Sequence, residues 1–203
     1  MAIKKKCDII VFKKYRVKGA LMTRCFWCNL KNPRYVKYHD EEWGYKRFSD
    51  EYLFEMLVLE SFQAGLSWEC VLNKREAFRT AFDDFDVNAI SLYQAEKIEE
   101  LCQNALIIRN RRKIEATVEN ARVFISIVSE FGSFLSYLRS FWDGKTIYDC
   151  KSTVSPLSDR ISADLKKKGM RFMGTTVVHS FLQAIGIVNA HTEECFLYNT
   201  ELL

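Results

Sequence analysis

An all-α protein is what this sequence predicts, and three observations predict it. The 203 residues include only two prolines and eight glycines, so few positions break a helix. Apolar residues recur at helical spacing along almost the whole chain. Strict alternation of apolar and polar residues, the mark of a half-buried strand, is nearly absent. The length suits one globular domain with a substantial core.

The predicted helices follow one another with few breaks. Residues 49–65 open on Ser49, a capping residue, and carry acids in the first turn, after which Leu53, Met56 and Leu57 fall on one face. Only residues 143–157 form a longer stretch without a helical pattern. The other predicted helices share the apolar periodicity and cover residues 68–82, 86–93, 95–102, 112–131, 133–142, 159–168 and 174–186.

The composition excludes several classes of protein. Hydrophobic residues make up 48% and aromatic residues 14% of the chain, which argues against disorder. No apolar run approaches the roughly 20 residues of a membrane span, and a signal peptide is not expected. Seven scattered cysteines, an odd number, indicate reduced thiols and metal ligands rather than a disulfide framework. We therefore expect a cytoplasmic protein without a membrane partner.

The positive charge is concentrated at the start of the chain. Residues 1–21 hold seven basic side chains and one acid, so the formal net charge of +4 resides there and the remainder is slightly acidic. We predict a basic extension over residues 1–21, which an upstream start or a disordered tail would explain, and a single domain over residues 22–203. A nucleic-acid partner would then be met by a local basic patch.

Two pairs of metal-ligand residues stand at opposite ends of the domain. Cys25 and His39 lie near its start, and His191 and Cys195 lie near its finish. Two thiolates and two imidazoles are a ligand set of closed, tetrahedral zinc sites. Inert buried cysteines and packed histidines are the alternative, and Cys28 offers a competing ligand in a C-x2-C with Cys25. The spacing alone leaves these alternatives open.

One acid breaks the apolar pattern of its predicted helix. Glu60 falls on the same face as the core residues of 49–65, where an unpaired carboxylate is costly. Tyr35 and Tyr38 are neighbours on a helical turn, and Trp43 and Trp68 flank Glu60 in the sequence. Aromatic rings with one carboxylate suit a flat cationic heterocycle. A buried ion pair with an arginine, in an aromatic-rich core, is the alternative.

A second constellation is typical of phosphate binding. A basic helix reaches Lys168, the chain turns at Gly169, and a new helix starts at Gly174 and Thr175. This is a helix–hairpin–helix pattern, in which glycines and free amides approach a phosphate closely and Arg171 adds charge. A solvated lysine-rich helix face is the alternative for the basic run.

Several of these segments resemble the type I bacterial family of 3-methyladenine DNA glycosylases. The resemblance extends from about Met22 to Cys195 and is carried by NPRYVKYHDEEWG, LFEMLVLESFQAGLSW, KKKGMRFMGTTVVHSFLQAIGIVNAH and the trailing Cys195. It implies the helix–hairpin–helix DNA glycosylase fold, with two helical lobes whose N- and C-terminal parts are joined by one structural zinc. The implied zinc ligands are Cys25, His39, His191 and Cys195.

The resemblance also implies an activity: a monomeric base-excision repair enzyme that flips 3-methyladenine out of alkylated double-stranded DNA and releases the free base. Glu60 would be the catalytic residue, and Tyr35, Tyr38 and Trp68 would complete the base pocket. In the cytoplasm the enzyme would meet the nucleoid through its substrate. The implied DNA-binding residues are Gly65, Leu66, Lys168, Arg171, Gly174 and Thr175.

The chemistry of the lesion agrees with this implication. Methylation at N3 puts a positive charge on adenine, so the base is already a good leaving group and needs little acid catalysis. Asn189 stands about where many relatives carry an aspartate, and no lysine stands out as a Schiff-base nucleophile. We therefore expect a monofunctional glycosylase without lyase activity. The turn Gly65–Leu66 would fill the gap left by the flipped base, with plain helix packing as the alternative.

Two other classes of protein compete with an excision enzyme. A zinc-stapled protein that grips DNA damage without cutting would need no intact catalytic set. A metal-dependent hydrolase would need an open coordination position, which a site with four protein ligands lacks. Release of free base from methylated DNA separates the three.

Overall fold

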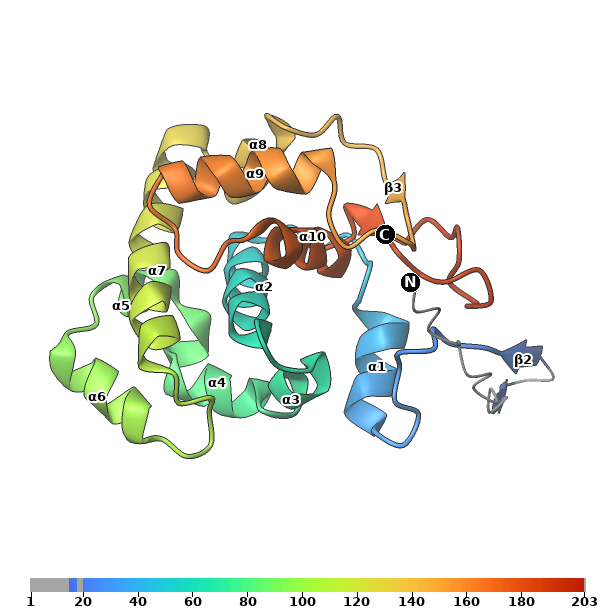
Figure 1. The fold of residues 1–203 in the computed structure, drawn as a ribbon, viewed down its shortest axis with the longest axis horizontal. Helices are drawn as coiled ribbons and strands as arrows, with labels where there is room; N and C mark the ends of the chain where they lie inside the picture. The colour runs from blue at the N-terminus through green and yellow to red at the C-terminus, as the bar shows by residue number, and fades with distance from the viewer. Residues whose placement is uncertain (1–14, 18–19, 203) are drawn as a thin grey trace, which may run out of the picture.

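The structure, a computed structural model, describes residues 15–17 and 20–202 and is mainly helical, as predicted (Figure 1). Two small two-stranded sheets are added, since strands of two or three residues are too short to show alternation. The helices are α1 Pro33–Glu41, α2 Asp50–Gln63, α3 Trp68–Asn73, α4 Arg75–Ala81, η1 Asp83–Phe85, α5 Val87–Ser91, α6 Ala95–Gln103, α7 Arg111–Phe131, α8 Phe134–Arg139, α9 Pro156–Lys167 and α10 Thr175–Ala184. The strands are β1 Tyr15–Val17, β2 Ala20–Met22, β3 Ile147–Tyr148 and β4 Val188–Asn189.

Helix α2 is the centre of the fold. Ser49 caps it by accepting a hydrogen bond from the Tyr52 amide, as the sequence predicts. Every residue from Leu53 to Phe62 is buried, because α3, α7, α8 and α10 all contact this helix. Figure 1 shows α1 on one side of α2 and α5, α6 and α7 on the other. A polar residue between Leu53 and Phe62 therefore lies in the interior whichever way it points.

The predicted helix boundaries are wrong at two places. The helix expected over residues 68–82 is interrupted at Lys74, and the bend leaves Arg75 able to reach Glu42 and Glu55. Helix α9 begins at Pro156 rather than at residue 159. Ser155 and its partner three residues on form a reciprocal capping box, and a proline at the first helical position is already preset for the helix.

The segment between α9 and α10 forms the predicted hairpin. It carries two left-handed residues, Gly169 at φ +104° and Phe172 at φ +56°. Asn120 of α7 fixes it from behind, accepting from the Arg171 amide at 2.7 Å and donating to the Arg171 carbonyl at 3.0 Å. Helices α9 and α10 also contact each other directly. The hairpin is thus a braced loop between two packed helices.

The two ends of the domain meet. The Phe196 amide donates to the Thr23 carbonyl at 2.9 Å, and β3 pairs in parallel with β4. The prediction for residues 1–21 falls mostly on positions outside the described residues; only the antiparallel β1–β2 ladder is described there. Among the described helices, none has the length and apolar character to cross a bilayer.

Candidate functional site: a four-ligand cluster beside an aromatic cavity

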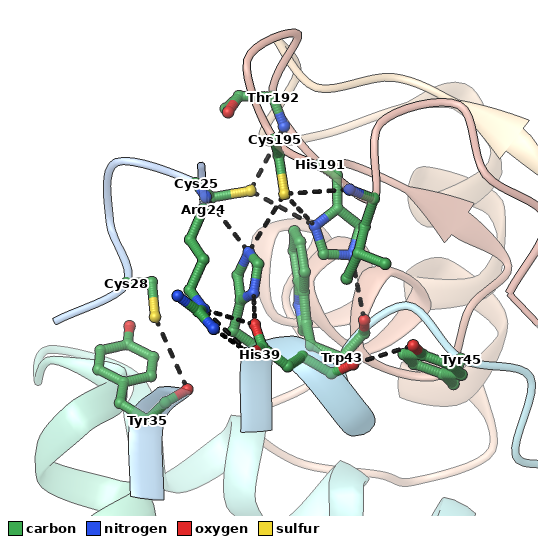
Figure 2. A network of polar contacts seen from close by, with 12 residues as sticks. Arg24, Cys25, Cys28, Tyr35, His39, Trp43, Tyr45, His191, Thr192 and Cys195 are labelled. Atoms are coloured by element: carbon green, nitrogen blue, oxygen red, sulfur yellow. Dashed lines mark hydrogen bonds and ion pairs between the residues drawn. The ribbon is translucent and has the colours of Figure 1, made fainter. Parts of the chain in front are cut away.

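The four predicted metal ligands converge on one point. Ligand atoms of Cys25, His39, His191 and Cys195 all lie within 4.8 Å of one another, and all four residues are buried. His191 Nδ1 is 3.4 Å from the sulfur of Cys25 and 3.4 Å from that of Cys195. His39 Nε2 is 3.5 Å from Cys195 Sγ. Figure 2 shows the two sulfurs and the two rings facing a common centre.

These separations match a tetrahedral zinc site. Zinc lies about 2.3 Å from sulfur and about 2.0–2.1 Å from nitrogen, which places tetrahedral ligand pairs about 3.3–3.8 Å apart. The residues present therefore fit a four-coordinate metal ion.

Both histidines are held from their outer side. His39 Nδ1 lies 2.8 Å from the Asp40 carboxylate, which Arg24 holds with two nitrogens, its Nε at 2.7 Å. His191 Nε2 lies 3.3 Å from the Trp43 carbonyl oxygen. A ring nitrogen bonded to a carboxylate or carbonyl leaves the other nitrogen as the metal ligand, which is the usual arrangement around bound zinc.

Cys28 is turned away from this cluster. Its thiol contacts the Tyr35 carbonyl at 3.8 Å, and burial raises its pKa to about 12, so it remains protonated. The geometry thus favours Cys25 over Cys28 as the ligand.

Replacing Cys28 by Ser should leave the metal content of the purified protein at that of the wild type, because the side chain lies outside the cluster. Elemental analysis checks this expectation. A Cys25→Ser variant is the matched comparison and should lose metal; the opposite pattern would assign the ligand to Cys28.

The predicted base pocket is a cavity of about 280 Å³ next to the cluster. Its lining includes Glu60, Tyr35, Tyr38 and Trp68, so the structure brings together all four residues predicted from the sequence. Tyr38 and Trp68 have ring centroids 5.2 Å apart and form part of the wall. The remaining lining residues are Trp27, Trp43, Gln63, Ser180 and Gln183.

Four of these lining residues were missed by the sequence reasoning. Gln63 stands three residues after Glu60 on α2, a spacing that places both on one face. Ser180 and Gln183 repeat that spacing on α10 within an otherwise apolar run. Those spacings were available signals. Trp27 had none, since it lies in the irregular segment before α1.

Glu60 is buried without a partner. It is 4% exposed, and its Oε2 has no hydrogen-bond partner among the residues that the structure describes. Desolvation alone raises its pKa to about 8. The alternative of a buried arginine pair is therefore wrong for this residue. A buried carboxyl that faces a cavity and lacks a protein partner can bind a hydrogen-bond donor or a cation that enters the cavity.

Another acid of α2 shows what an arginine partner does. Glu55 accepts from Arg75 at 2.8 Å and from Arg79 at 2.9 Å. Although burial raises its pKa, the hydrogen bonds from Arg75 and Arg79 outweigh that effect, and the pKa falls below its ordinary value. The same helix thus carries one carboxylate, Glu55, whose charge is balanced by two arginines, and one acid, Glu60, that faces a cavity.

The wall of the cavity and the metal cluster share aromatic contacts. Trp43 lies 4.6 Å from the His191 ring and 4.6 Å from Trp27, centroid to centroid. Trp27 also contacts the His39 ring at 5.2 Å. Figure 2 shows Trp43 beside the ligand rings. The outer wall of the cavity is therefore built directly on the residues that would hold the metal.

A second cavity of about 200 Å³ adjoins the first and shares Glu60, Gln63 and Ser180 with it. It is bounded by the turn after α2, where Gly65 has φ +85° and Leu66 is 43% exposed. The first turn of α10 forms its other side. An exposed leucine thus lies at the edge of this second cavity.

The predicted DNA-binding residues of the hairpin lie in its loop and at the start of α10. Lys168 pairs with Glu130 at 3.4 Å and Arg171 with Glu119 at 2.9 Å, both partners belonging to α7. Thr175 Oγ1 donates to Asp159 at 2.6 Å. Gly174 is the N-cap of α10 and supplies no side-chain cap, so the first amides of this helix remain available.

A helix–hairpin–helix beside an aromatic cavity with one unpaired acid fits the class of DNA glycosylases that the sequence resembles. Family comparison agrees, because a model described as methyladenine glycosylase matches residues 27–198. The chain belongs to the methyladenine glycosylase family, and its enzyme class is that of the DNA-3-methyladenine glycosylases.

Individual relatives are similar over nearly their whole length. DNA-3-methyladenine glycosylase 1 of Escherichia coli (strain K12) is 41% identical over 183 residues, which cover 87% of this chain and 97% of that protein. A crystal structure of 3-methyladenine DNA glycosylase I superposes with a TM-score of 0.82 at 42% identity, covering 86% of this chain and 99% of that one. A structure of a variant glycosylase I in complex with 3-methyladenine gives a TM-score of 0.80 at 35% identity, with 84% and 95% covered.

Proposed function

We propose that this enzyme flips 3-methyladenine out of alkylated double-stranded DNA and hydrolyses its glycosidic bond, without cleaving the strand. The observation that carries the proposal is the unpaired Glu60 carboxyl in a cavity lined by aromatic rings. The relative solved with 3-methyladenine supports the choice of base. On this proposal residues 22–203 act as one domain and as a monomer, on nucleoid DNA in the cytoplasm.

The cavity residues divide the work on the base. Tyr35, Tyr38 and Trp68 would stack on the faces of the cationic ring, and cation–π attraction contributes about 0.5–2 kcal/mol. Glu60 would accept hydrogen bonds from the edge of the base and, when ionised, stabilise its positive charge. Since the charged base leaves readily, water attacks the anomeric carbon as the bond to N9 breaks, and the proton released passes to solvent.

Two features support a monofunctional reaction. No lysine is among the residues that line either cavity, so the lining offers no amine for a Schiff base. Asn189 is buried, donates to the Thr200 carbonyl and accepts from the His191 amide, which gives this amide a structural task. Hydrolysis would therefore depend on the lesion's own leaving ability and on base binding.

The residues around the cavity mouth would hold the DNA. Leu66, with Gly65 beside it, would occupy the gap in the stack, and the free amides at Gly174 and Thr175 would meet a phosphate. Lys168 and Arg171 are paired with exposed glutamates, and such pairs contribute little in water, so a phosphate can replace the carboxylate.

Zinc is the proposed metal, held by Cys25, His39, His191 and Cys195. With four protein ligands it would have no open position and would supply stability, not chemistry. It would join the N- and C-terminal parts of the domain.

The proposal is tested on methylated duplex DNA with zinc-loaded protein. We expect chromatography to find free 3-methyladenine, and gels to show strand breaks only after alkali, with no borohydride-trapped complex. Binding to the lesion without release of base would instead support the damage-binding class. Breaks without alkali would contradict the monofunctional assignment.

A further inference from the structure

One buried cation has no part in the proposed chemistry. Lys113 lies in the first turn of α7 and is 5% exposed. Its Nζ donates to the Phe62 carbonyl at 2.9 Å and to the Ala64 carbonyl at 2.7 Å. Among the described residues no carboxylate forms an ion pair with it. A lysine buried among backbone carbonyls is expensive, and burial lowers its pKa, so its position calls for an explanation.

The two carbonyls belong to the end of α2. They flank Gln63, the last residue of that helix and part of both cavities. The last carbonyls of a helix lack intrahelical partners and carry its negative dipole end, where a cation is favourable. Lys113 therefore caps α2 from another helix, 49 residues further along the chain than Ala64.

The exposed turn at the cavity edge comes directly after this cap. Ala64 leaves the helical conformation, Gly65 has φ +85° with open space around the position that a Cβ would take, and Leu66 is exposed. The Leu66 amide returns to the Gln63 carbonyl at 2.6 Å. Within the described residues, the other hydrogen bond to the backbone of residues 64–66 is the one that Lys113 donates to Ala64.

We propose that Lys113 is a positioning residue, which holds the Ala64–Leu66 turn rigid so that Leu66 can enter the DNA stack when the base is flipped. This inference rests on the proposed function. Unstacking a nucleotide costs a few kcal/mol. A side chain that takes the nucleotide's place in the stack must therefore be held by a rigid backbone. Displacement of a group by about 1 Å can cost on the order of 100-fold in rate. A cap that merely stabilises α2 would have no such effect on flipping alone.

The test compares Lys113→Met with wild type in two assays. Single-turnover release of 3-methyladenine from duplex DNA should fall about 10-fold or more. Affinity for free 3-methyladenine, followed by tryptophan fluorescence, should change less than about 3-fold, since the cavity itself is kept. Lys97→Met is the matched control: Lys97 pairs with Glu100 on α6, and its loss removes the same charge without touching the turn.

A double-mutant cycle decides whether Lys113 acts through Leu66. Lys113→Met added to Leu66→Ala should slow excision no more than about 2-fold beyond Leu66→Ala alone, because both remove the same wedge. Independent, multiplying losses overturn the proposal. So does a parallel loss of free-base affinity, which would make Lys113 a general support of the cavity.

A second pair of variants covers a failure of the methionine variant to fold. Lys113→Arg keeps the charge and the donors and should restore excision in part, whereas Lys113→Gln is too short to reach both carbonyls and should behave as Lys113→Met does. Equal excision by all three overturns the proposal. Absence of base release by wild type would instead contradict the proposed function. A 2-aminopurine beside the lesion gives a separate readout, since its fluorescence rise on binding should be lost in Lys113→Met.

Discussion

Replacing Glu60 by Gln should lower kcat/KM for excision of 3-methyladenine by about 10- to 100-fold. Hydrogen bonds to a charged group contribute about 1.5–3 kcal/mol, and the amide keeps the shape of the carboxyl while losing its charge. The measurement is release of base from methylated duplex, corrected for spontaneous depurination. Unchanged excision, or unchanged affinity for the free base, would remove Glu60 from the site.

The pH dependence should separate the two proteins further. Burial raises the pKa of Glu60 to about 8, so the carboxylate forms only as the pH approaches that value. Because kcat/KM reports the free enzyme, it should rise with pH toward a plateau above about 8 in wild type. The Glu60→Gln variant should show no such rise.

The same substitution should stabilise the fold at high pH. The carboxyl ionises near 4.5 in the unfolded chain and near 8 in the folded protein. Above about 4.5 the unfolded chain loses the proton while the folded protein keeps it, so stability is lost as the pH rises toward and through 8. At pH 9, Glu60→Gln should be more stable than wild type by on the order of 4 kcal/mol, and near equal at pH 4, in denaturant titrations.

Glu55→Gln is the matched control from the same helix. Its carboxylate is bonded to Arg75 and Arg79, so the substitution weakens a buried ion pair and should destabilise the protein. Binding of free 3-methyladenine should remain near that of wild type, since Glu55 lies outside the cavity. Glu60→Gln should thus weaken binding without destabilising the fold, whereas Glu55→Gln should destabilise the fold without weakening binding.

Replacing His191 by Ala should abolish stoichiometric metal binding and lower the free energy of unfolding by about 4 kcal/mol. A ligand that binds only the folded state contributes that amount when it is about a thousandfold above its Kd. Three ligands remain, but only Cys195 would then link the C-terminal part of the domain to the metal. Elemental analysis and denaturant unfolding, with and without a chelator, measure both effects.

His179→Ala is the control for the loss of a buried histidine. His179 lies on α10, where its Nδ1 contacts the Ser155 hydroxyl at 3.3 Å, away from the four ligands. This variant should keep its metal, and its stability should still respond to the chelator. Wild-type metal content in His191→Ala would refute the ligand set.

The periodic pattern predicted the mainly helical fold because most helices here present one apolar stripe to a core. The interruption at Lys74 was beyond such reasoning, since both halves keep the same periodicity and only the distant Glu42 and Glu55 explain where Arg75 must point. The start of α9 was within reach. A serine before Pro156 is a capping signal that the pattern of apolar residues alone does not use.

The site shows the same division. Residue type and spacing left inert cysteines and packed histidines open as alternatives, and the resemblance implied the four ligands that the structure brings together. For Glu60 the sequence left a pocket and a buried arginine pair as alternatives, because residues Leu53–Phe62 are all buried and Glu55 is enclosed as well. Only the placement of Arg75 and Arg79 distinguishes the two acids, and that depends on packing between helices.

The joining of the chain ends has a consequence for biosynthesis. Trp27 and Trp43 rest on the His39 and His191 rings, so this side of the cavity depends on residues as far along the chain as His191. Contacts of such long sequence separation form late, and a chain still emerging from the ribosome lacks them. The chain as far as His191 must therefore be synthesised before this side of the cavity can form.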